Sequence, residues 1–366
     1  MKGVIPMTAL QKFNCPCCGN VVMLDMDDPM TVCASCETEF DSASVQAYLA
    51  DVTEPKQDDM TWDYSEVVSW RLRELAEMNV YTCGRCGEFL LNEHDDASVC
   101  PICNCELERK GKMSGKLRPD LIIPFKLDRS AATKRLQKRM NRIKLLPKIF
   151  KEEKRLEEVK GVYIPVWFFR TDAQGKLICK GTQVRNRSNS ESDNISTAHY
   201  HISRTGTVHF PGVTAMGSSK IEDRLVNDLE SFDLRDAVEF RSAHLADYFV
   251  LQCDVEAEEC VSSVNDRIKA HTEAALQKTI GDYTNVARQS FTLSLQNSSA
   301  KCVWCPVWFW STTWKRKRYT VTINGQTGKM AGNLPVDRKA FLKWYFCLFG
   351  IAATVCFLAG WLLWLV

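Results

Sequence analysis

The sequence predicts an α+β fold that combines small cysteine-rich modules, a larger mixed domain and a final apolar helix. Three observations lead to this prediction. The first hundred or so residues carry four C-x2-C pairs, two similar tryptophan-containing phrases occur in the second half, and the last 22 residues, Tyr345 to Val366, contain no charge. A chain of 366 residues is long enough to form several such modules.

Composition limits the class of protein and its compartment. The net charge of +2 makes no case for nucleic-acid binding by the chain as a whole. The 17 cysteines are not preceded by the apolar core of a secretory signal, because "MKGVIPMTALQKFNCP" is too polar. We therefore expect these thiols in a reducing cytosol, where metal binding is favoured over disulfides.

The cysteine spacing predicts two metal sites. Fourteen residues separate the first two C-x2-C pairs, and thirteen separate the third from the fourth. Two such pairs bring four thiolates into a tetrahedron around Zn²⁺, at about 2.3 Å from the ion. The sequence thus predicts two structural Zn²⁺ ions, each in a zinc ribbon, with the ligands Cys15, Cys18, Cys33, Cys36, Cys83, Cys86, Cys100 and Cys103.

Other roles for these thiols are weaker. Iron suits four thiolates as well, but rubredoxin-like sites separate their pairs by a longer stretch. A thioredoxin-like dithiol needs a βαβ context that is missing here. Cys17 and Cys105 fall outside the spacing and are expected to be spare. We expect the first ribbon at residues 1–45, an acidic linker and an amphipathic helix at 46–79, and the second ribbon at 80–110.

Two related phrases predict an internal duplication. "GVYIPVWFF" at 161–169 and "CVWCPVWFW" at 302–310 share the pattern P-V-W-F. Each follows an expected helix, at 148–158 and 260–281, and each precedes an expected hairpin turn, at 174–175 and 324–325. The sequence thus predicts one duplicated helix and β-hairpin domain at 118–334, with an antiparallel sheet.

Side chains within this domain carry further expectations. We expect the two phrases to form core strands, with Cys302 and Cys305 as buried apolar residues. The alternative is a binding groove lined by Trp167 and Trp308. A hairpin turn is also expected at Thr205-Gly206, beside the strand that carries His199 and His201.

A basic segment precedes the first phrase. Residues 126–160 contain 13 Lys and Arg against 5 Asp and Glu. We expect Asp128 or Ser130 to cap a helix that carries Ala132, Leu136, Met140 and Ile143 on one face and leaves its opposite, basic face outside. A solvated face, anionic lipid, nucleic acid and an acidic protein all remain open as its surroundings.

The C-terminal segment predicts a membrane anchor at 343–366. A helix of this length spans the hydrocarbon core, and a run of 22 residues without a polar stripe disfavours the alternative of a buried core helix. Trp344 and Trp361 lie near its two ends, as interfacial aromatic residues do. Lysines and arginines just before it predict a single-pass protein of the cytoplasmic (inner) membrane, with its N-terminal bulk in the cytoplasm. Small residues within the span leave a homo-oligomer open.

Catalytic motifs are missing from the sequence. The patterns G-x-x-x-x-G-K-[ST], G-x-S-x-G and H-E-x-x-H do not occur. The expectation is therefore a protein that is not an enzyme. An enzyme that uses His199 and His201, with His209 nearby, or the tryptophan groove, is the weakest of the hypotheses that we carry forward.

The motifs together resemble a bacterial family of membrane proteins described as TFIIB-type zinc-ribbon-containing proteins. The resemblance covers nearly the whole chain and rests on Cys15 to Cys36, Cys83 to Cys103, Pro124-Phe125, Gly161 to Trp167, Pro306 to Trp308 and Asn324 to Gly328. Some relatives are encoded beside phage-shock (PspA-like) and band-7 proteins. The resemblance therefore implies such proteins as partners and a role in envelope stress.

Two functions follow as hypotheses. The first is a membrane-anchored zinc-ribbon adaptor that recruits or scaffolds partner proteins, with lipid contacted through the C-terminal helix. The second is a membrane-tethered zinc-ribbon protein that binds nucleic acid in transcription or replication. The ribbon sequences "DMDDP", "ETEFD" and "NEHDDA" are acidic, which disfavours contacts with phosphates and favours the adaptor.

Overall fold

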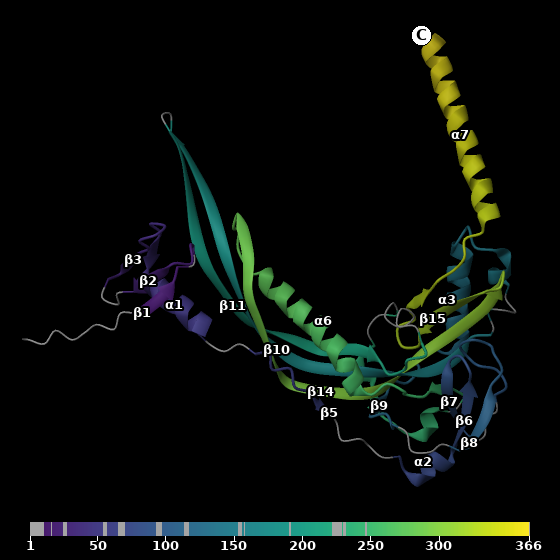
Figure 1. Cartoon of the computed structure of the whole chain (residues 1–366). Coiled ribbons are helices and arrows are strands. Elements are labelled where there is room, and N and C mark those ends of the chain that lie inside the picture. The colour runs from purple at the N-terminus through teal and green to yellow at the C-terminus, as the bar shows by residue number, and fades with distance from the viewer. Residues whose placement is uncertain are drawn as a thin grey trace, which may run out of the picture. The chain divides into compact units, whose positions relative to one another are not determined.

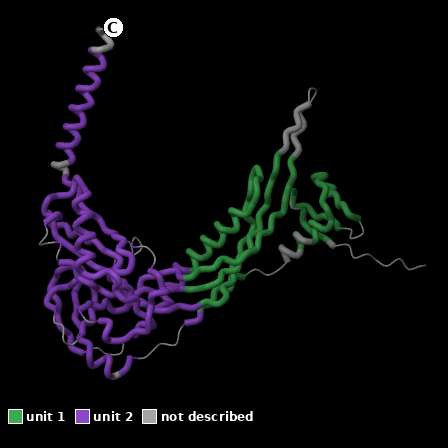
Figure 2. The backbone as a smooth tube through the Cα atoms, turned by 180° about the vertical axis from the view of Figure 1, so that it is seen from behind, with its two compact units in different colours: residues 1–62, 170–211, 265–298 green, residues 63–169, 212–264, 299–366 purple. Residues whose placement is uncertain are grey.

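The computed structural model describes residues 11–365 with gaps at residues 16, 25–27, 54–56, 65–69, 93–96, 113–116, 153–155, 157, 190–191, 222–228, 230–231 and 246 (Figure 1). The fold is α+β, as the sequence predicts, with two four-cysteine sites in the N-terminal part and one apolar helix at the C-terminal end. The chain divides into two compact units (Figure 2). Unit 1 contains residues 1–62, 170–211 and 265–298, and unit 2 contains residues 63–169, 212–264 and 299–366.

The N-terminal ribbon of unit 1 consists of two short hairpins and a helix. Strand β1 (Gln11–Asn14) pairs with β2 (Val21–Leu24), and β3 (Met30–Val32) pairs with β4 (Glu39–Asp41), both antiparallel. Helix α1 (Ser42–Thr53) follows directly and takes up residues 46–53, the beginning of the stretch 46–79 that was expected to hold a linker and a helix. The small core contains Phe13, Val22, Leu24 and Val45 together with cysteines of the first site.

Three long strands contribute residues to both units. They are β10 (Lys160–Asn189), β11 (Ser192–Met216) and β14 (Asn285–Trp314). The turns expected at Gln174-Gly175 and Thr205-Gly206 are wrong, because β10 and β11 run straight through these positions. A Cβ at Gly175 would lie 2.9 Å from Thr272 and 3.1 Å from Leu276 of helix α6 (Ala257–Gln277). The glycine thus allows close packing of α6 on the strand (Figure 1) and does not mark a turn.

The shorter strands of unit 2 and the three long strands belong to one sheet. Its order is β12-β9-β14-β10-β13-β7-β6-β8, with β11 beside β10, β15 beside β14 and β16, and β5 beside β14. Most of the recorded pairings are antiparallel, whereas β13, β9 and β5 pair in parallel with the long strands. The short members are β5 (Asp63–Tyr64), β6 (Met78–Cys83), β7 (Gly87–Asn92), β8 (Glu108–Lys112), β9 (Leu121–Ile122), β12 (Val238–Glu239), β13 (Phe249–Leu251), β15 (Lys317–Asn324) and β16 (Met330–Gly332).

The two tryptophan phrases lie in the core of unit 2, as expected for core strands. Trp304, Trp310 and Phe169 are almost completely buried. Helix α3 (Arg129–Arg142) covers part of this core, with Ala132, Leu136 and Met140 in one apolar cluster with Trp308 and Trp310. The Asp128 carboxylate caps α3 by accepting a hydrogen bond from the backbone N–H of Ala131 at 2.7 Å, so the first of the two expected caps is the one used.

Several expected helices are shorter than the sequence suggests. Of the amphipathic helix expected within 46–79, the described residues show α2 (Leu72–Ala76), and residues 65–69 lie outside the described part. The helix expected at 148–158 begins as one 3₁₀ turn, η1 (Lys148–Lys151). Further 3₁₀ turns are η2 (Leu234–Asp236) and η3 (Ser242–Leu245). The helix expected at 260–281 is present as α6.

The hairpin expected at Asn324-Gly325 is present, but its turn differs from the two-residue type. The left-handed residue is Gly328, with φ of +78°. The Asn324 side chain accepts hydrogen bonds from the N–H groups of Gln326 and Thr327 at 2.8 and 3.0 Å, which extends the loop. The two-residue turn with two positive φ angles instead joins β14 to β15, at Lys315 (50°) and Arg316 (62°).

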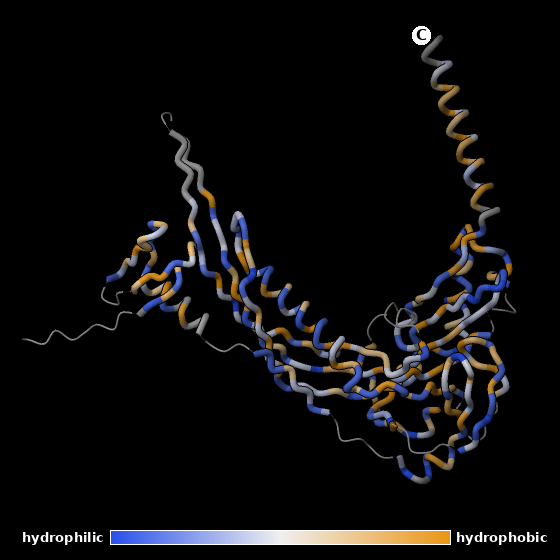
Figure 3. The backbone as a smooth tube through the Cα atoms, viewed as in Figure 1, coloured by the Kyte–Doolittle hydropathy of each residue, from blue (hydrophilic) through white to orange (hydrophobic). Residues whose placement is uncertain are grey.

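Helix α7 (Arg338–Leu365) ends the described chain. Residues Phe341–Trp361 form a stretch long and apolar enough to cross a membrane, and none of this stretch is buried in the protein. Figure 3 shows the contrast between this mostly hydrophobic helix and the strands, in which hydrophobic and hydrophilic residues are mixed.

Candidate metal centres

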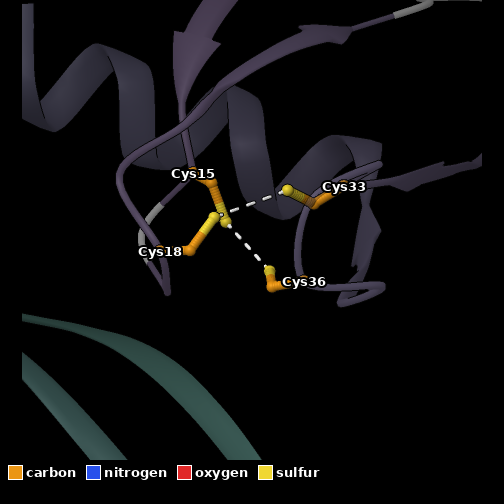
Figure 4. Close-up of side chains that lie close together, drawn as sticks. All are labelled: Cys15, Cys18, Cys33 and Cys36. Atoms are coloured by element: carbon orange, nitrogen blue, oxygen red, sulfur yellow. Dashed lines mark hydrogen bonds between the residues drawn. The ribbon is translucent and has the colours of Figure 1, made fainter.

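The first four-cysteine site lies between the two hairpins of the N-terminal ribbon. The sulfurs of Cys15, Cys18, Cys33 and Cys36 lie within 4.8 Å of one another and face a common centre (Figure 4). The Sγ–Sγ distances are 3.7 Å for Cys15–Cys36 and 3.7 Å for Cys18–Cys33. Sulfurs at the corners of a tetrahedron, each about 2.3 Å from a central ion, are about 3.8 Å apart. The site therefore has the size that a tetrahedral thiolate site requires.

The second site has the same donor set in a more buried setting. Cys83, Cys86, Cys100 and Cys103 again lie within 4.8 Å of one another, and all four are buried. The Sγ atoms of Cys83 and Cys103 are 3.4 Å apart. These cysteines belong to one apolar cluster with Phe89 of β7, Val162 of β10 and Val303 of β14. An ion bound here would link the second ribbon to the core of unit 2.

A left-handed residue completes each of the four cysteine turns. It stands four positions after the first cysteine of each pair and is Gly19, Glu37, Gly87 or Asn104, with φ of 80°, 55°, 89° and 57°. The N–H groups of Gly19 and Glu37 each donate to the carbonyl of the preceding first cysteine at 2.8 Å. Glycine adopts this conformation without steric cost at Gly19 and Gly87, whereas Glu37 and Asn104 adopt it without being glycine.

Hydrogen bonds favour a thiolate within each site of the metal-free protein. The hydroxyl of Thr38, 3.1 Å from the Cys36 sulfur, and the Thr38 backbone N–H lower the pKa of Cys36 to about 6. The neighbouring Cys86 thiol and the backbone N–H groups of Cys103 and Ile102 lower the pKa of Cys100 to about 5, against the effect of burial. Thiolate is the form that binds metal. Thr38 was missed in the sequence, although its position two residues after a cysteine was a usable signal.

The donor set limits what a bound ion can do. Each site offers four sulfurs, which leave no open position for water or substrate around a tetrahedral ion. Zn²⁺ fits this set, as does iron, because both accept four thiolates. Cys17 and Cys105 belong to neither group of four. The two sites are therefore suited to structural ions, and two zinc sites are consistent with the geometry.

The histidine face offers no comparable donor set. His199 and His201 line a cavity of about 90 Å³ together with Tyr200 and Lys180. His209 pairs instead with Asp172, with Nδ1 2.5 Å from Oδ1. Within the described part of the chain, the groups of three or more clustered metal-ligating side chains consist of cysteine alone. The three histidines are thus not brought together around one point.

The alternative expectation was a groove lined by both Trp167 and Trp308, and the two side chains have different surroundings. Trp308 lines a cavity of about 550 Å³ with Arg129, Lys160 and Tyr248. Trp167 is not among its lining residues, and its indole N–H donates to the carbonyl of Val255 at 2.9 Å. Trp167 and Trp308 therefore do not share this cavity.

The remaining C-x2-C pair is buried, as expected. Cys302 and Cys305 are 1% and 0% exposed. The neighbouring Cys253 thiol and burial raise the pKa of Cys302, and burial raises the pKa of Cys305. Protonated, buried thiols of this kind behave as small apolar residues.

Comparison with known proteins gives one informative similarity. Over 234 residues the chain is 25% identical to the uncharacterized protein YdjG of Bacillus subtilis (strain 168), which covers 64% of this chain and 69% of YdjG. No model of a known protein family matches the chain. No solved structure matches it. The comparisons therefore leave the resemblance to zinc-ribbon membrane proteins unconfirmed.

Proposed function

We propose that this protein is a non-enzymatic zinc-ribbon adaptor, anchored in the cytoplasmic membrane by α7, which recruits or scaffolds partner proteins. The closed four-sulfur sites support this proposal, because zinc held there stabilises a ribbon and has no position for a substrate. The exposed apolar stretch Phe341–Trp361 supports the anchor, with the bulk of the chain on the cytoplasmic side.

The single observation that carries the recruiting role is an apolar patch on the first ribbon. We name the side chains of Val21, Met23, Met30 and Val32 the ribbon patch. They lie on β2 and β3, and their exposed fractions are 65%, 44%, 45% and 55%. Scattered apolar residues are normal on surfaces, whereas four on two adjoining short strands favour a protein interface. By the resemblance stated above, the expected partners are PspA-like or band-7 proteins in envelope stress.

The experiment is affinity purification of the full chain from gently solubilised membranes, followed by mass spectrometry. The test variant is Val21→Ser/Val32→Ser, which removes half of the ribbon patch and leaves the cysteines intact. Its matched control is Val184→Ser/Val286→Ser, which changes two exposed valines outside the ribbon (43% and 40% exposed). We expect proteins retained by the native chain and the control to be lost, at least tenfold, from the patch variant.

A second variant links the result to the metal. Cys15→Ser/Cys33→Ser removes two ligands of the first site and should lose the same partners, because the ribbon loses its ion. Equal retention of all partners by the patch variant would contradict the recruiting role of the ribbon. Recovery of nucleic acid or polymerase subunits in place of other proteins would favour the nucleic-acid hypothesis.

A further inference from the structure

The connector between α3 and η1 lies beside the start of α7. The backbone N–H of Asp337 donates to the carbonyl of Leu145 at 2.8 Å. The neighbouring Lys144 places its ammonium 5.1 Å from the centre of the Trp344 ring, a cation–π contact. Trp344 stands at the beginning of the apolar stretch of α7, where aromatic residues mark the boundary between membrane and water. Lys144 is therefore located at that boundary when α7 crosses a membrane.

The β14–β15 hairpin contacts η1, which follows this connector. The ring of Phe150 in η1 lies 6.1 Å from that of Trp314 and 5.6 Å from that of Tyr319, between ring centres. These two aromatic residues flank Lys315, Arg316, Lys317 and Arg318, four consecutive basic residues that are all exposed. The tip of the hairpin is thus next to the segment that holds the start of α7.

We name Lys144, Lys148, Lys315, Arg316, Lys317 and Arg318 the basic collar. All six are exposed, and residues 142–151 and 314–319 contain no acidic residue. Within the described part of the chain, no carboxylate lies within ion-pair distance of any collar residue. Among the residues that the structure describes, the positive charge of the collar is therefore not paired with a carboxylate.

Two of the collar residues, Lys315 and Arg316, form the turn of the hairpin and have a strained backbone. Lys315 and Arg316 both have left-handed backbones, with φ of 50° and 62°. Such a turn normally contains Asn or Gly, and each residue with a Cβ is less stable there. Strained residues of this kind are concentrated at binding sites, because the surrounding structure is needed to hold them. Two basic residues in this turn point to a role for their side chains.

We propose that the basic collar is a binding site for anionic phospholipid headgroups. The proposal rests on the proposed function, because it requires α7 to cross the membrane. Lysine and arginine next to a membrane-spanning helix are attracted to the negative surface of the cytoplasmic leaflet. Phosphates of nucleic acid offer the same chemistry, but the contact of Lys144 with Trp344 places this member of the collar at the level of lipid headgroups. Lipid is thus the partner that the position of the collar favours.

The test uses the full chain reconstituted in nanodiscs, either of phosphatidylcholine alone or with about one-third phosphatidylglycerol. Hydrogen–deuterium exchange is followed in residues 142–151 and 314–319. We expect exchange in both segments to slow at least roughly fivefold in the anionic discs, and the effect to disappear at about 0.5 M salt. A chain that does not enter either kind of disc would contradict the anchor itself, which separates that failure from failure of the collar.

Two matched variants identify the side chains. Lys315→Gln/Arg316→Gln/Arg318→Gln removes three charges of the collar and should abolish the slowing in anionic discs. Arg85→Gln/Arg109→Gln/Lys110→Gln removes three exposed charges on the second ribbon and β8 and should retain it. Equal exchange in the two kinds of disc would overturn the proposal. Protection by a DNA duplex added to neutral discs, without protection in anionic discs, would also overturn it in favour of nucleic acid.

Discussion

Single residues set the geometry of the cysteine turns. Gly84 and Gly87 both lie in "CGRCG", but Gly87 alone has a left-handed backbone, with φ of 89°. A Cβ at Gly84 would meet nothing within 4 Å, and a Cβ at Gly87 would meet the flexible Lys220 side chain at 3.1 Å. The two positions therefore differ mainly in backbone conformation.

We predict that Gly87→Ala destabilises the second site by about 1–2 kcal/mol, because alanine disfavours the left-handed region. Gly84→Ala is the matched control and should change the free energy by less than about 0.5 kcal/mol. Competition with a zinc chelator measures the effect as a roughly tenfold loss of zinc affinity for Gly87→Ala. Equal affinities for the two variants would show that the turn does not require this conformation.

A buried ion pair anchors α2. Glu74 and Arg118 have side-chain exposures of 12% and 5%, and both of their hydrogen bonds are 3.1 Å long. Burial alone would raise the pKa of Glu74, but hydrogen bonds from Arg118 and from the Arg71 backbone outweigh it and lower the pKa. The guanidinium of Arg118 also lies 5.1 Å from the Phe240 ring. The carboxylate is therefore favoured in its ionised form.

This lowered pKa predicts a pH dependence of stability. A carboxyl whose pKa is lowered by folding stabilises the protein above its ordinary value, here 4.5, and the effect is lost as the pH falls through the folded value. We expect Glu74→Gln to lower the free energy of unfolding by about 3 kcal/mol at pH 7, since Arg118 is left unpaired. The difference from the native chain should shrink below pH 4.5.

Denaturant unfolding at pH 7 and at about pH 4 measures this difference, and loss of metal in acid affects both proteins alike. Glu77→Gln is the control. Its pair with Arg73 is exposed, and its removal should cost less than about 1 kcal/mol at either pH. A difference for Glu74→Gln that stays constant with pH would contradict the prediction.

At the scale of elements, the two ribbons differ in what they stabilise. The second site shares its apolar cluster with β7, β10 and β14, whereas the first is surrounded by the small core of its own ribbon. Loss of an ion should therefore affect different parts of the protein. The second ion should stabilise unit 2, and the first should stabilise the N-terminal ribbon alone.

We predict that Cys100→Ser lowers the main thermal unfolding transition by roughly 5 °C or more, since about 2 kcal/mol of stabilisation has an effect of this size. Cys33→Ser should leave this transition nearly unchanged. Each variant should retain one of the two ions, and the spare Cys105→Ser should retain both. Calorimetry with metal analysis measures these outcomes. Equal shifts for Cys100→Ser and Cys33→Ser would show that the ribbons contribute equally to the core.

The turns show where the sequence was informative about elements and where it was not. The cysteine spacing located both four-sulfur groups, because metal ligands need a fixed local geometry. Gly175 and Gly206 suggested turns, yet both lie within long strands that approach Leu276 of α6. The two-residue turn at Lys315-Arg316 was missed, because its residues disfavour the conformation they adopt. Packing against distant elements decided these cases, and a local pattern does not contain that information.

At the scale of the whole molecule, the amino-acid sequence predicted the order of the modules better than their lengths. The α+β class and the apolar C-terminal helix follow from composition and periodicity. Composition and periodicity do not predict strands of 30 residues such as β10 and β14. The glycine and polar residues within these strands are of the types that usually end a strand. The partition into two units that both contain parts of these strands depends on contacts far apart in the chain.

The last prediction concerns α7 and the rest of the chain. The stretch Phe341–Trp361 is not buried, so it contributes little to the folded core. We expect a chain ending at residue 337 to unfold at nearly the same temperature as the full chain, but to move from the membrane fraction to the soluble fraction. Carbonate extraction and calorimetry measure the two effects. The matched control, which replaces Val355 and Leu358 by alanine, leaves an apolar span and should stay in the membrane.

Protease digestion of sealed inverted vesicles tests the orientation of the full chain in the membrane. In the proposed orientation the ribbons and the long strands face the cytoplasm, so protease added outside the inverted vesicles should digest them and should spare the end of α7. In spheroplasts, protease outside should leave the chain intact. Digestion in spheroplasts would place the collar on the opposite face, away from the anionic cytoplasmic leaflet, and would contradict the anchor orientation on which the lipid proposal depends. In the truncation experiment described above, a chain ending at residue 337 that stays in the membrane fraction would show that residues before α7 attach the protein to the membrane.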